Sequence, residues 1–334
     1  MVDPVTGFIY PEQWVIRCTA PSRLREVVSG LSILTSDGTL LRRGFTTGAS
    51  AAAACKASLL SLKKEIGEVD ILIPCGLRVQ IPVKGEQGEG RCIKFGGDHP
   101  SDVTAGLEFV ASARSVGEGG AFVPGEGIGT FIRNTPRYRS GEPSISPTAM
   151  SCIRNAIEEA IHETCIFDAR VELIVPRGRE VAAHTLNARI GVEGGISLLG
   201  TTGFVEPWDD HLTESLIERV RDTNKVVLTT GRTGLRYSCL LFPDYTVILA
   251  GGKFLEVLTT ARGKVILCGL PGLILRSLDP AFLEGSPFRT IEEMTSSPDF
   301  IRRAYATIAR FQENHPGVRV VLIDREGTVV VDSP

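Results

Sequence analysis

The sequence lacks the features typical of membrane proteins, secreted proteins and nucleic-acid-binding proteins. Its most apolar stretch, Val265 to Leu275, is interrupted by Gly269, Pro271 and Gly272 and is too short to cross a bilayer. The first residues, MVDPVTGFIYPEQW, contain no basic segment followed by an apolar one, so we expect no secretory signal. The formal net charge is -3, whereas nucleic acid or an anionic membrane surface would select a basic face. We therefore expect a cytoplasmic protein that binds neither.

The sequence also lacks the common motifs of metal sites and nucleophilic enzymes. Its 8 cysteines include no CxxC pair and lie mostly in apolar runs, as reduced core thiols do. It has no HExxH, H-x-E or GxSxG signature. His162 and Cys165 have the spacing of neighbours on a helix, but no second pair accompanies them, which favours a structural role. We expect no metal held by the protein and no hydrolysis by a side-chain nucleophile.

The bulk composition is that of a globular protein with room for two domains. The chain has 334 residues, of which 43% are hydrophobic and 22% charged. Three ranges differ in pattern, and we expect an N-terminal extension over residues 1–40, an α+β two-layer domain over residues 41–204 and an α/β domain over residues 205–334. No fixed-period repeat is present.

Residues 41–204 combine helical and antiparallel strand signals. Small residues of high helix propensity predict a helix after Thr47, with Thr46 or Thr47 as its N-cap. Such a helix start suits either a close ligand or tight helix packing. Two β-rich runs around a Pro-Cys-Gly turn predict a hairpin over Val69–Val83, and the following GRCIKFG is a candidate third strand. Leu107–Val116 is ambiguous between strand and helix.

The second half of this range adds a long helix and a glycine-rich segment. Apolar residues at helical spacing predict a helix over Ser146–Thr164, followed by the strand VELIVP and a short helix in RGREVAAHTLN. GEGIGT, residues 125–130, neither follows a clear strand nor opens a helix, so a tight turn is favoured over phosphate binding.

Residues 205–334 alternate strands and helices. The predicted helix over Asp209–Arg221 is followed by the strands VVLT, YTVILA and KVILCG, with a helix after each, then by a late helix over Ser297–Glu313 and a hairpin at Arg325-Glu326-Gly327. This alternation predicts a Rossmann-like parallel sheet covered by helices. Ligands of such sheets bind beyond the carboxyl ends of the strands. GRTGLR, at Gly231–Arg236, lies at one such end and suits an anion or a nucleotide, but it is not a P-loop.

The tripeptide Thr-Thr-Gly occurs three times, beginning at Thr46, Thr201 and Thr229. Each copy lies at an expected boundary between elements. Glycine there permits a positive φ or a close approach, and a threonine hydroxyl can cap a helix start. Such corners can hold an anion or a polar ligand.

Two groups of charged residues stand out in the expected loops. Asp98, His99 and Asp102 share one loop, where carboxylates could orient a substrate, act as a base or stabilise an Asx turn. Arginines gather at three places, where they could be solvated or could hold carboxylates in bidentate fashion. They are Arg42 and Arg43; Arg133, Arg137 and Arg139; and Arg177 and Arg179.

Several blocks together resemble the CbiD family of cobalt-precorrin-5B C1-methyltransferases of anaerobic cobalamin biosynthesis. They are LRRGFTTGASAAAACKA from Leu41, GGDHPSDVT from Gly96, PGEGIGT from Pro124, GEPSISP from Gly141 and TLNARIGVEGGISLLGTTGFVEP from Thr185. Their order and spacing match across most of residues 41–235, and the GVEGGISLLGTTG block is too long to arise from generic glycine turns.

The resemblance implies a reaction and its cofactor. Members of the family transfer a methyl group from S-adenosylmethionine to ring carbon 1 of cobalt-precorrin-5B, giving cobalt-precorrin-6A. The substrate is a tetrapyrrole with acetate and propionate arms, which would give the arginine clusters a purpose, and its cobalt would arrive with it. The family also has an α+β two-layer domain followed by a smaller Rossmann-like one. Homo-oligomerisation stays open.

The resemblance also points to site residues, while the candidates from Thr229 onward rest only on their position at a strand end. Asp98 and Asp102 are the catalytic candidates, for orienting or proton handling. The substrate-binding candidates are Arg42, Arg43, Thr46, Thr47, Gly48, Thr104, Asn187 and Arg189. The cofactor-binding candidates are Gly194, Gly195, Thr201, Thr202, Gly203, Thr229, Gly231 and Arg232.

The chain departs from the family pattern in its last domain. Many members carry Cys-Ser-Asn-Phe and then Gly-His-Ile-Gly-Lys, where this chain has Tyr237-Ser238-Cys239-Leu240 and Cys268-Gly269-Leu270-Pro271-Gly272. The helix start also reads TTGASAAAA in place of the commoner TTGTCAAAA. A non-catalytic subunit that binds a tetrapyrrole or a nucleotide is therefore the alternative. A nicotinamide-dependent reductase is a weaker one, because the GxGxxG motif is missing.

Overall fold

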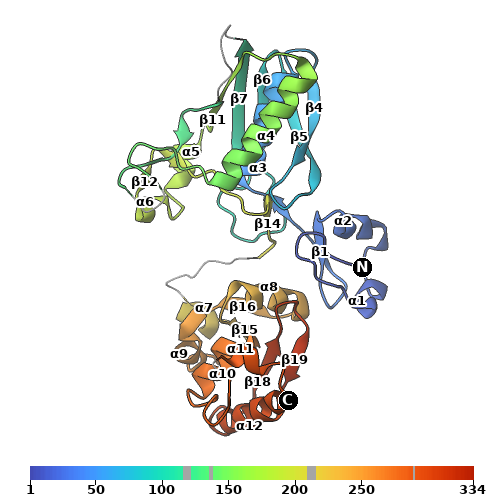
Figure 1. Cartoon of the computed structure of the whole chain (residues 1–334), viewed down its shortest axis with the longest axis vertical. Helices are drawn as coiled ribbons and strands as arrows, with labels where there is room; N and C mark the ends of the chain where they lie inside the picture. Colours follow the sequence, from blue (N-terminus) through green and yellow to red (C-terminus); the bar gives the residue numbers. More distant parts are fainter. Residues whose placement is uncertain (116–121, 135–137, 209–215, 289) are drawn as a thin grey trace. The chain divides into compact units, whose positions relative to one another are not determined.

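The chain forms two compact units of mixed α/β structure with several sheets (Figure 1). The structure is a computed structural model, and it describes residues 1–115, 122–134, 138–208, 216–288 and 290–334. One unit consists of Ser29–Ile33 and Leu41–Asp209, and the other of Met1–Val28, Leu34–Leu40 and Asp210–Pro334. Residues 1–40, expected as an extension, are therefore mostly part of the unit that contains the C-terminus.

The first of these units is built on a six-stranded sheet with the strand order β4-β5-β6-β7-β11-β8. The strands are β4 (Ile66–Leu72), β5 (Arg78–Glu86), β6 (Glu89–Ile93), β7 (Glu108–Ser115), β8 (Phe122–Pro124) and β11 (Ala169–Ile174). The predicted hairpin is confirmed, since β4 pairs antiparallel with β5, and the third strand is β6. The ambiguous segment after Leu107 is the strand β7.

Two helices cover one face of this sheet. They are α3 (Thr47–Leu60) and α4 (Pro147–Thr164), and both were predicted. The N-cap of α3 is Thr46, one of the two residues expected there. All of the α3 side chains are buried, because the helix lies between the sheet and α4. Alanine, glycine and serine fill most of α3 because larger side chains would separate the layers. Tight packing is thus one reason for the small helix start.

Short pairs of strands complete this unit beside the sheet. Residues 127–131 form β9 (Gly127–Ile128) and β10 (Thr130–Phe131), which pair with β13 (Gly195–Ile196) and β12 (Val192–Glu193). β14 (Phe204–Val205) pairs antiparallel with β3 (Gly44–Phe45) and so brings residues 204–205 beside the entry to α3. The short helices are α5 (Gly178–Ala182) and α6 (Asn187–Ile190).

The other unit is built on a five-stranded sheet with the order β16-β15-β17-β18-β19. The strands are β15 (Lys225–Thr229), β16 (Thr246–Leu249), β17 (Lys264–Gly269), β18 (Val318–Ile323) and β19 (Val329–Asp332). The first four in this order are parallel, and β18 and β19 form the predicted C-terminal hairpin. Apolar side chains on both sides of these strands are buried, as expected for parallel strands covered by helices.

Helices follow the parallel strands as the alternation predicted. They are α7 (Leu216–Arg221), α8 (Arg232–Leu241), α9 (Phe254–Leu258), α10 (Pro271–Leu278), α11 (Ile291–Met294) and α12 (Asp299–Asn314). The expected helix start at Asp209 lies outside the described residues. The core on one face joins side chains from these helices, apart from α8, with alternate residues of the strands, such as Val226 and Leu228. Leu235 and Leu240 of α8 are buried outside this cluster.

The N-terminal segment packs against α8. It contains α1 (Glu12–Ile16) and α2 (Leu24–Val28), and β1 (Ser32–Leu34) pairs with β2 (Leu40–Arg42). The ring of Phe8 lies 5.4 Å from that of Tyr237, and the Ser36 amide donates to the Leu240 carbonyl at 2.8 Å. These contacts explain why residues at the start of the chain belong to the unit formed by its end.

All 8 cysteines are thiols, and five of them are buried. Burial raises the pKa of Cys92 to about 12 and that of Cys152 to about 11, so both remain protonated at neutral pH. The expected position of these cysteines in the core is confirmed. In the parts of the chain that the structure describes, no helix is long and apolar enough to cross a membrane.

We expect Ala52→Leu in α3 to destabilise the protein by about 1–3 kcal/mol, because Ala52 is fully buried and the added atoms have no space. The matched control is Ala309→Leu at an exposed position of α12, which should change the free energy of unfolding by less than about 0.5 kcal/mol. Urea denaturation followed by circular dichroism measures both. Equal stability of the two variants would contradict the packing explanation.

Candidate functional site

The start of α3 is held by its own N-cap and by a distant loop. The Thr46 hydroxyl accepts from the Ala49 amide at 3.3 Å and donates to the Gly203 carbonyl at 3.2 Å. The Thr46 amide also donates to the Gly203 carbonyl, at 3.0 Å. The first two Thr-Thr-Gly copies, 155 positions apart by the numbering of Thr46 and Thr201, are therefore in direct contact.

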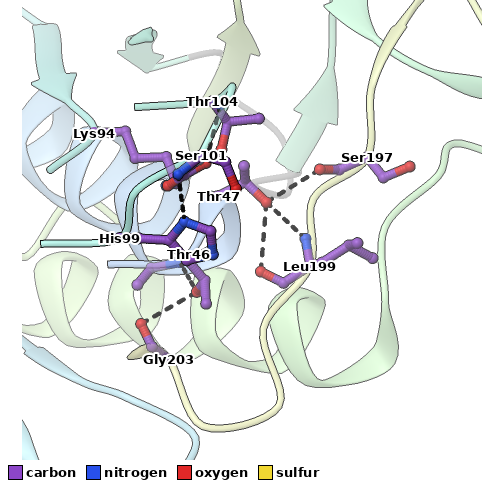
Figure 2. A network of polar contacts seen from close by, with 11 residues as sticks. Thr46, Thr47, Lys94, His99, Ser101, Thr104, Ser197, Leu199 and Gly203 are labelled. Carbon is purple, nitrogen blue, oxygen red and sulfur yellow. Dashed lines mark hydrogen bonds and ion pairs between the residues drawn. The ribbon is translucent and has the colours of Figure 1, made fainter. Parts of the chain in front are cut away.

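Ser197 and Leu199 of the same loop bind Thr47 (Figure 2), and Leu199 also binds Gly48. The Leu199 amide donates to the Thr47 hydroxyl at 2.8 Å, and this hydroxyl donates to the Ser197 carbonyl at 3.0 Å. The Gly48 amide donates to the Leu199 carbonyl at 2.9 Å. These protein groups already occupy several of the amides that a helix start would offer to an anion. We call this contact between Thr46–Gly48 and residues 197–203 the corner. Thr46 is its partly exposed residue.

Asn187 anchors the other side of this loop. Its side-chain amide donates to the Gly195 carbonyl at 2.9 Å, and its oxygen accepts from the Ser197 hydroxyl at 3.0 Å. Asn187 is buried. It therefore acts on the shape of the loop. The backbone of Arg189 lies in α6, and its side chain is outside what the structure describes.

Two glycines of the loop have steric reasons to be glycine. Gly203 has φ +91°, and a Cβ there would meet the Ile73 side chain at 2.5 Å. Gly195 pairs with Gly127 so closely that a Cβ would collide with the Gly127 carbonyl. Gly194 lies in the exposed turn before it, also with positive φ. The Thr202 hydroxyl donates to the Phe204 carbonyl and accepts from the Phe204 amide, whereas Thr201 is exposed.

Asp102 and Lys94 form a buried ion pair beneath the loop of residues 95–106. The Lys94 ammonium contacts one Asp102 oxygen, and the other accepts from the Thr104 amide at 3.0 Å and hydroxyl at 2.6 Å. Burial alone would raise the pKa of Asp102, but the Lys94 charge and the Thr104 hydrogen bonds hold it below its ordinary value. Burial lowers the pKa of Lys94, and Asp102 opposes that shift. The stability contributed by Asp102 is present above the ordinary carboxyl pKa and is lost as the pH falls through the lower folded value.

Asp98 and Arg42 form a more exposed pair at the edge of the same loop. Asp98 accepts from the Arg42 amide at 2.7 Å and from its guanidinium at 3.1 Å. The guanidinium also lies 5.3 Å from the centre of the Phe95 ring. Half of the Arg42 side chain is exposed. It can therefore turn a donor toward a ligand carboxylate while it stays near Asp98.

Arg43 is placed very differently from its neighbour. Its side chain is 1% exposed, and it contacts Glu206 at 3.1 Å and the Gly30 carbonyl at 2.9 Å. It also lies over the Phe204 ring. Sequence reasoning treated Arg42 and Arg43 as one basic cluster, but only Arg42 presents its charge to solvent.

The third Thr-Thr-Gly copy lies in the other unit, after β15. The Thr229 hydroxyl is fully buried and has no hydrogen-bond partner among the described residues, while Gly231 is the N-cap of α8. A Cβ at Gly231 would meet nothing within 4 Å. Arg232 begins α8 and is exposed. These three residues lie at a carboxyl end of the parallel sheet, as expected.

Two cavities were not identified from the sequence. One, of about 570 Å³, lies on the exposed face of the first sheet and includes Phe45, Ile93 and Phe95. Alternation in β6 could have signalled it, because Ile93 and Phe95 are apolar where the strand faces outward. The other, of about 750 Å³, lies after β17 and β18. Ligands were expected beyond the carboxyl ends of the parallel strands, but no pattern in the sequence indicates that the ends of β17 and β18 enclose a cavity.

The remaining residues considered from the sequence are the possible metal ligands and the other arginines. Within the described ranges, no three His, Cys, Asp or Glu side chains are grouped so that they could hold a metal ion. Cys165 ends α4 with a left-handed conformation and contacts the His162 carbonyl, which is a structural arrangement. Arg177 pairs with Glu180 at the surface. Arg137 lies outside the described residues.

Removal of Lys94 tests the buried pair. We expect Lys94→Met to cost about 3–5 kcal/mol, because it leaves the Asp102 charge buried without its partner. The double variant with Asp102→Asn should be more stable than Lys94→Met alone. Lys84→Met, which breaks an exposed contact with Glu86, is the control and should cost less than about 1 kcal/mol. Thermal and urea unfolding give the values, and equal losses at Lys94 and Lys84 would contradict the ion-pair assignment.

The chain is similar to known proteins over its whole length. The sequence model of the CbiD family matches residues 26–207. Two curated proteins, both named cobalt-precorrin-5B C(1)-methyltransferase, come from Methanoregula boonei and Methanospirillum hungatei. They are 52% and 51% identical to this chain, and each alignment covers 100% of both sequences.

A solved structure is also similar. The cobalamin biosynthesis protein (cbiD) from Archaeoglobus fulgidus is 35% identical, with a TM-score of 0.58 and coverage of 97% of this chain and 100% of that one. Because the family model spans more than half of the chain and the curated relatives align from end to end, the chain belongs to the CbiD family.

Proposed function

We propose that this protein transfers a methyl group from S-adenosylmethionine to ring carbon 1 of cobalt-precorrin-5B and so produces cobalt-precorrin-6A. The observation that carries the proposal is the corner where Thr46 and Thr47 bind residues 197–203. Both sides of the corner lie within the range matched by the family model. The full-length identity to the named methyltransferases supports the same conclusion.

The proposed architecture is an α+β two-layer domain and a Rossmann-like domain. The five-stranded sheet supports the second assignment, since four of its strands are parallel and are joined through helices. Counted from β15, its order is 2-1-3-4-5, which is that of a doubly wound fold. In such folds the chain leaves β15 in one direction and β17 in the other, and ligands bind where these connections diverge.

The reaction needs geometry more than side-chain chemistry. An electron pair of the macrocycle forms the bond from ring carbon 1 to the methyl group, while the bond from sulfur to methyl breaks and leaves a neutral thioether. Because the sulfonium is already activated, the protein contributes mainly by holding donor and acceptor in line. A covalent nucleophile is unnecessary, and cobalt enters with the substrate.

The proposed roles of the site residues follow from their surroundings. Arg42 binds a carboxylate arm of the tetrapyrrole, because its guanidinium is half-exposed. Asp98 orients Arg42, and Asp102 with Thr104 fixes the loop above Lys94. Arg43, Thr47, Gly48 and Asn187 position the same surface from beneath, while Thr46 and Thr201 are the more exposed members of the corner.

The remaining glycines and the residues after β15 have proposed roles of their own. Gly194, Gly195, Thr202 and Gly203 shape the backbone of the loop. Sequence position makes Thr229, Gly231 and Arg232, at the end of β15, candidate donor contacts.

Incubation with cobalt-precorrin-5B and S-adenosylmethionine labelled at its methyl group tests the activity. We expect one labelled methyl group per turnover, located at ring carbon 1 by nuclear magnetic resonance, and release of S-adenosylhomocysteine. A reaction without protein is the control. Binding of the tetrapyrrole with no incorporation of label would instead favour a non-catalytic binding subunit, and the methyltransferase proposal would fall.

Substitutions in the loop of residues 95–106 and its partner test the proposed roles. We expect Arg42→Ala and Asp98→Asn to lower kcat/KM about 10- to 100-fold, because a misplaced substrate loses near-attack geometry. Arg302→Ala, which removes a more exposed arginine paired with Asp299 on α12, should leave kcat/KM unchanged. If Asp98→Asn and Asp102→Asn both kept full kcat/KM, the orienting and proton-handling roles would be abandoned.

A further inference from the structure

A cavity lies at the carboxyl edge of the parallel sheet. Its volume is about 750 Å³, and its walls come from the segment after β17, from α10 and α11, and from the turn after β18. Leu270 is the residue that directly follows β17, and Asp324 directly follows β18. The cavity thus lies on the side of a parallel sheet where ligands bind.

The inner wall of the cavity is apolar. Leu270, Phe282, Leu283 and Ile291 contribute to it, and an aromatic ring beside aliphatic side chains suits the flat face of a purine. At Gly272 the wall is open, because a Cβ there would meet nothing within 4 Å. A volume of this size lies in the usual range for small-molecule and cofactor sites, about 300–1,000 Å³.

The charges around the cavity favour a cation. Four acidic residues and two arginines line it, so acidic side chains outnumber basic ones. They are Asp279, Glu292, Asp324, Glu326, Arg276 and Arg325. This sign opposes a tetrapyrrole with many carboxylate arms and attracts a ligand with net positive charge.

Neighbouring ion pairs leave part of this charge available. Glu292 pairs with Arg325 at 2.6 Å, and Asp279 pairs with Arg310 at 2.9 Å. The Glu326 side chain makes no hydrogen bond or ion pair with any residue in the described ranges, and its backbone amide is fixed by Asp324 at 3.0 Å. Among the described residues, no cation is paired with this carboxylate, which lines the cavity.

We infer that this cavity, bounded by Leu270, Gly272, Phe282 and Glu326, binds the adenosyl sulfonium donor. The inference rests on the proposed function and places the donor in this cavity instead of at the end of β15. Adenine lies against the apolar wall, the acidic rim attracts the sulfonium and ammonium groups, and Arg276 is available for the amino-acid carboxylate. The lining does not include Thr229, Gly231 or Arg232, which lie one strand away after β15.

Filling the cavity tests the location. Isothermal titration of the full-length protein with S-adenosylmethionine, with and without cobalt-precorrin-5B, compares Gly272→Trp with the control Gly252→Trp. Both glycines have open space around them, but Gly252 lies after β16 and does not line the cavity. We expect Kd to rise at least about tenfold in Gly272→Trp, a loss of about 1.4 kcal/mol, and to stay unchanged in Gly252→Trp.

A change of charge at Glu326 gives a second test that does not depend on filling the cavity. Glu326→Lys lies in an exposed turn, so it should fold even if Gly272→Trp does not. We expect it to weaken S-adenosylmethionine more than S-adenosylhomocysteine, which lacks the sulfonium charge, whereas Glu256→Lys outside the cavity should affect neither. Donor binding by the wild type with equal Kd in Gly272→Trp and Gly252→Trp, or no charge preference at Glu326, would overturn the inference. Failure of the wild type to bind donor at all would overturn the proposed function as well.

Discussion

The burial of α3 on every side is the constraint on which the first unit depends. A helix that touches a sheet on one face and α4 on the other leaves little space for large side chains, and Leu59 and Leu60 come only at its end. Its one charged residue is Lys56, whose ammonium reaches Glu159 and the Asp70 carbonyl. The helix start must approach just as closely, since a Cβ at Gly48 would lie 2.7 Å from that of Ala149. The same small residues bring the loop of residues 197–203 within hydrogen-bonding distance of the first turn. Packing and the candidate site therefore depend on one set of residues.

Buried charges hold the surroundings of this helix start in place. Arg43 fixes the chain before α3 through Glu206 and Gly30, and Lys94 fixes the loop of residues 95–106 through Asp102. A buried charge is costly unless its partner is present, so such pairs tolerate few alternative arrangements of the loops. Arg42 and Asp98 add a more exposed pair at the same place. These pairs fix the loops around the helix start and leave the Arg42 guanidinium half-exposed, an arrangement suited to positioning a carboxylated substrate.

Local patterns predicted most of the elements, because their signals lie within short stretches of sequence. The alternation and the Pro-Cys-Gly turn suffice for the hairpin of β4 and β5, and helix propensity with a threonine cap suffices for α3. The contact between Thr46 and Gly203 has no local signal, since it depends on how β14 pairs with β3. The same holds for the buried state of Arg43, which sequence cannot distinguish from the exposed state of Arg42. The segment that contains Phe8 and Trp14 has no helical or strand periodicity in its sequence, yet Phe8 packs against both Trp14 and Tyr237.

The two units differ in the chemistry that their surfaces can offer, and this difference bears on how one chain could handle two unlike substrates. The cavity after β17 and β18 has an apolar wall and an acidic rim, which favours a compact cation and repels a polycarboxylate. The first unit offers Arg42 beside exposed apolar side chains, Ile93 and Phe95, which suits a large ring with carboxylate arms. Opposite electrostatic preferences would keep each substrate out of the other's site without any steric selection. The departure from the family pattern at Leu270–Gly272 falls in the wall of the acidic cavity, so it changes the surroundings of the proposed donor and leaves the Thr46–Gly203 corner untouched.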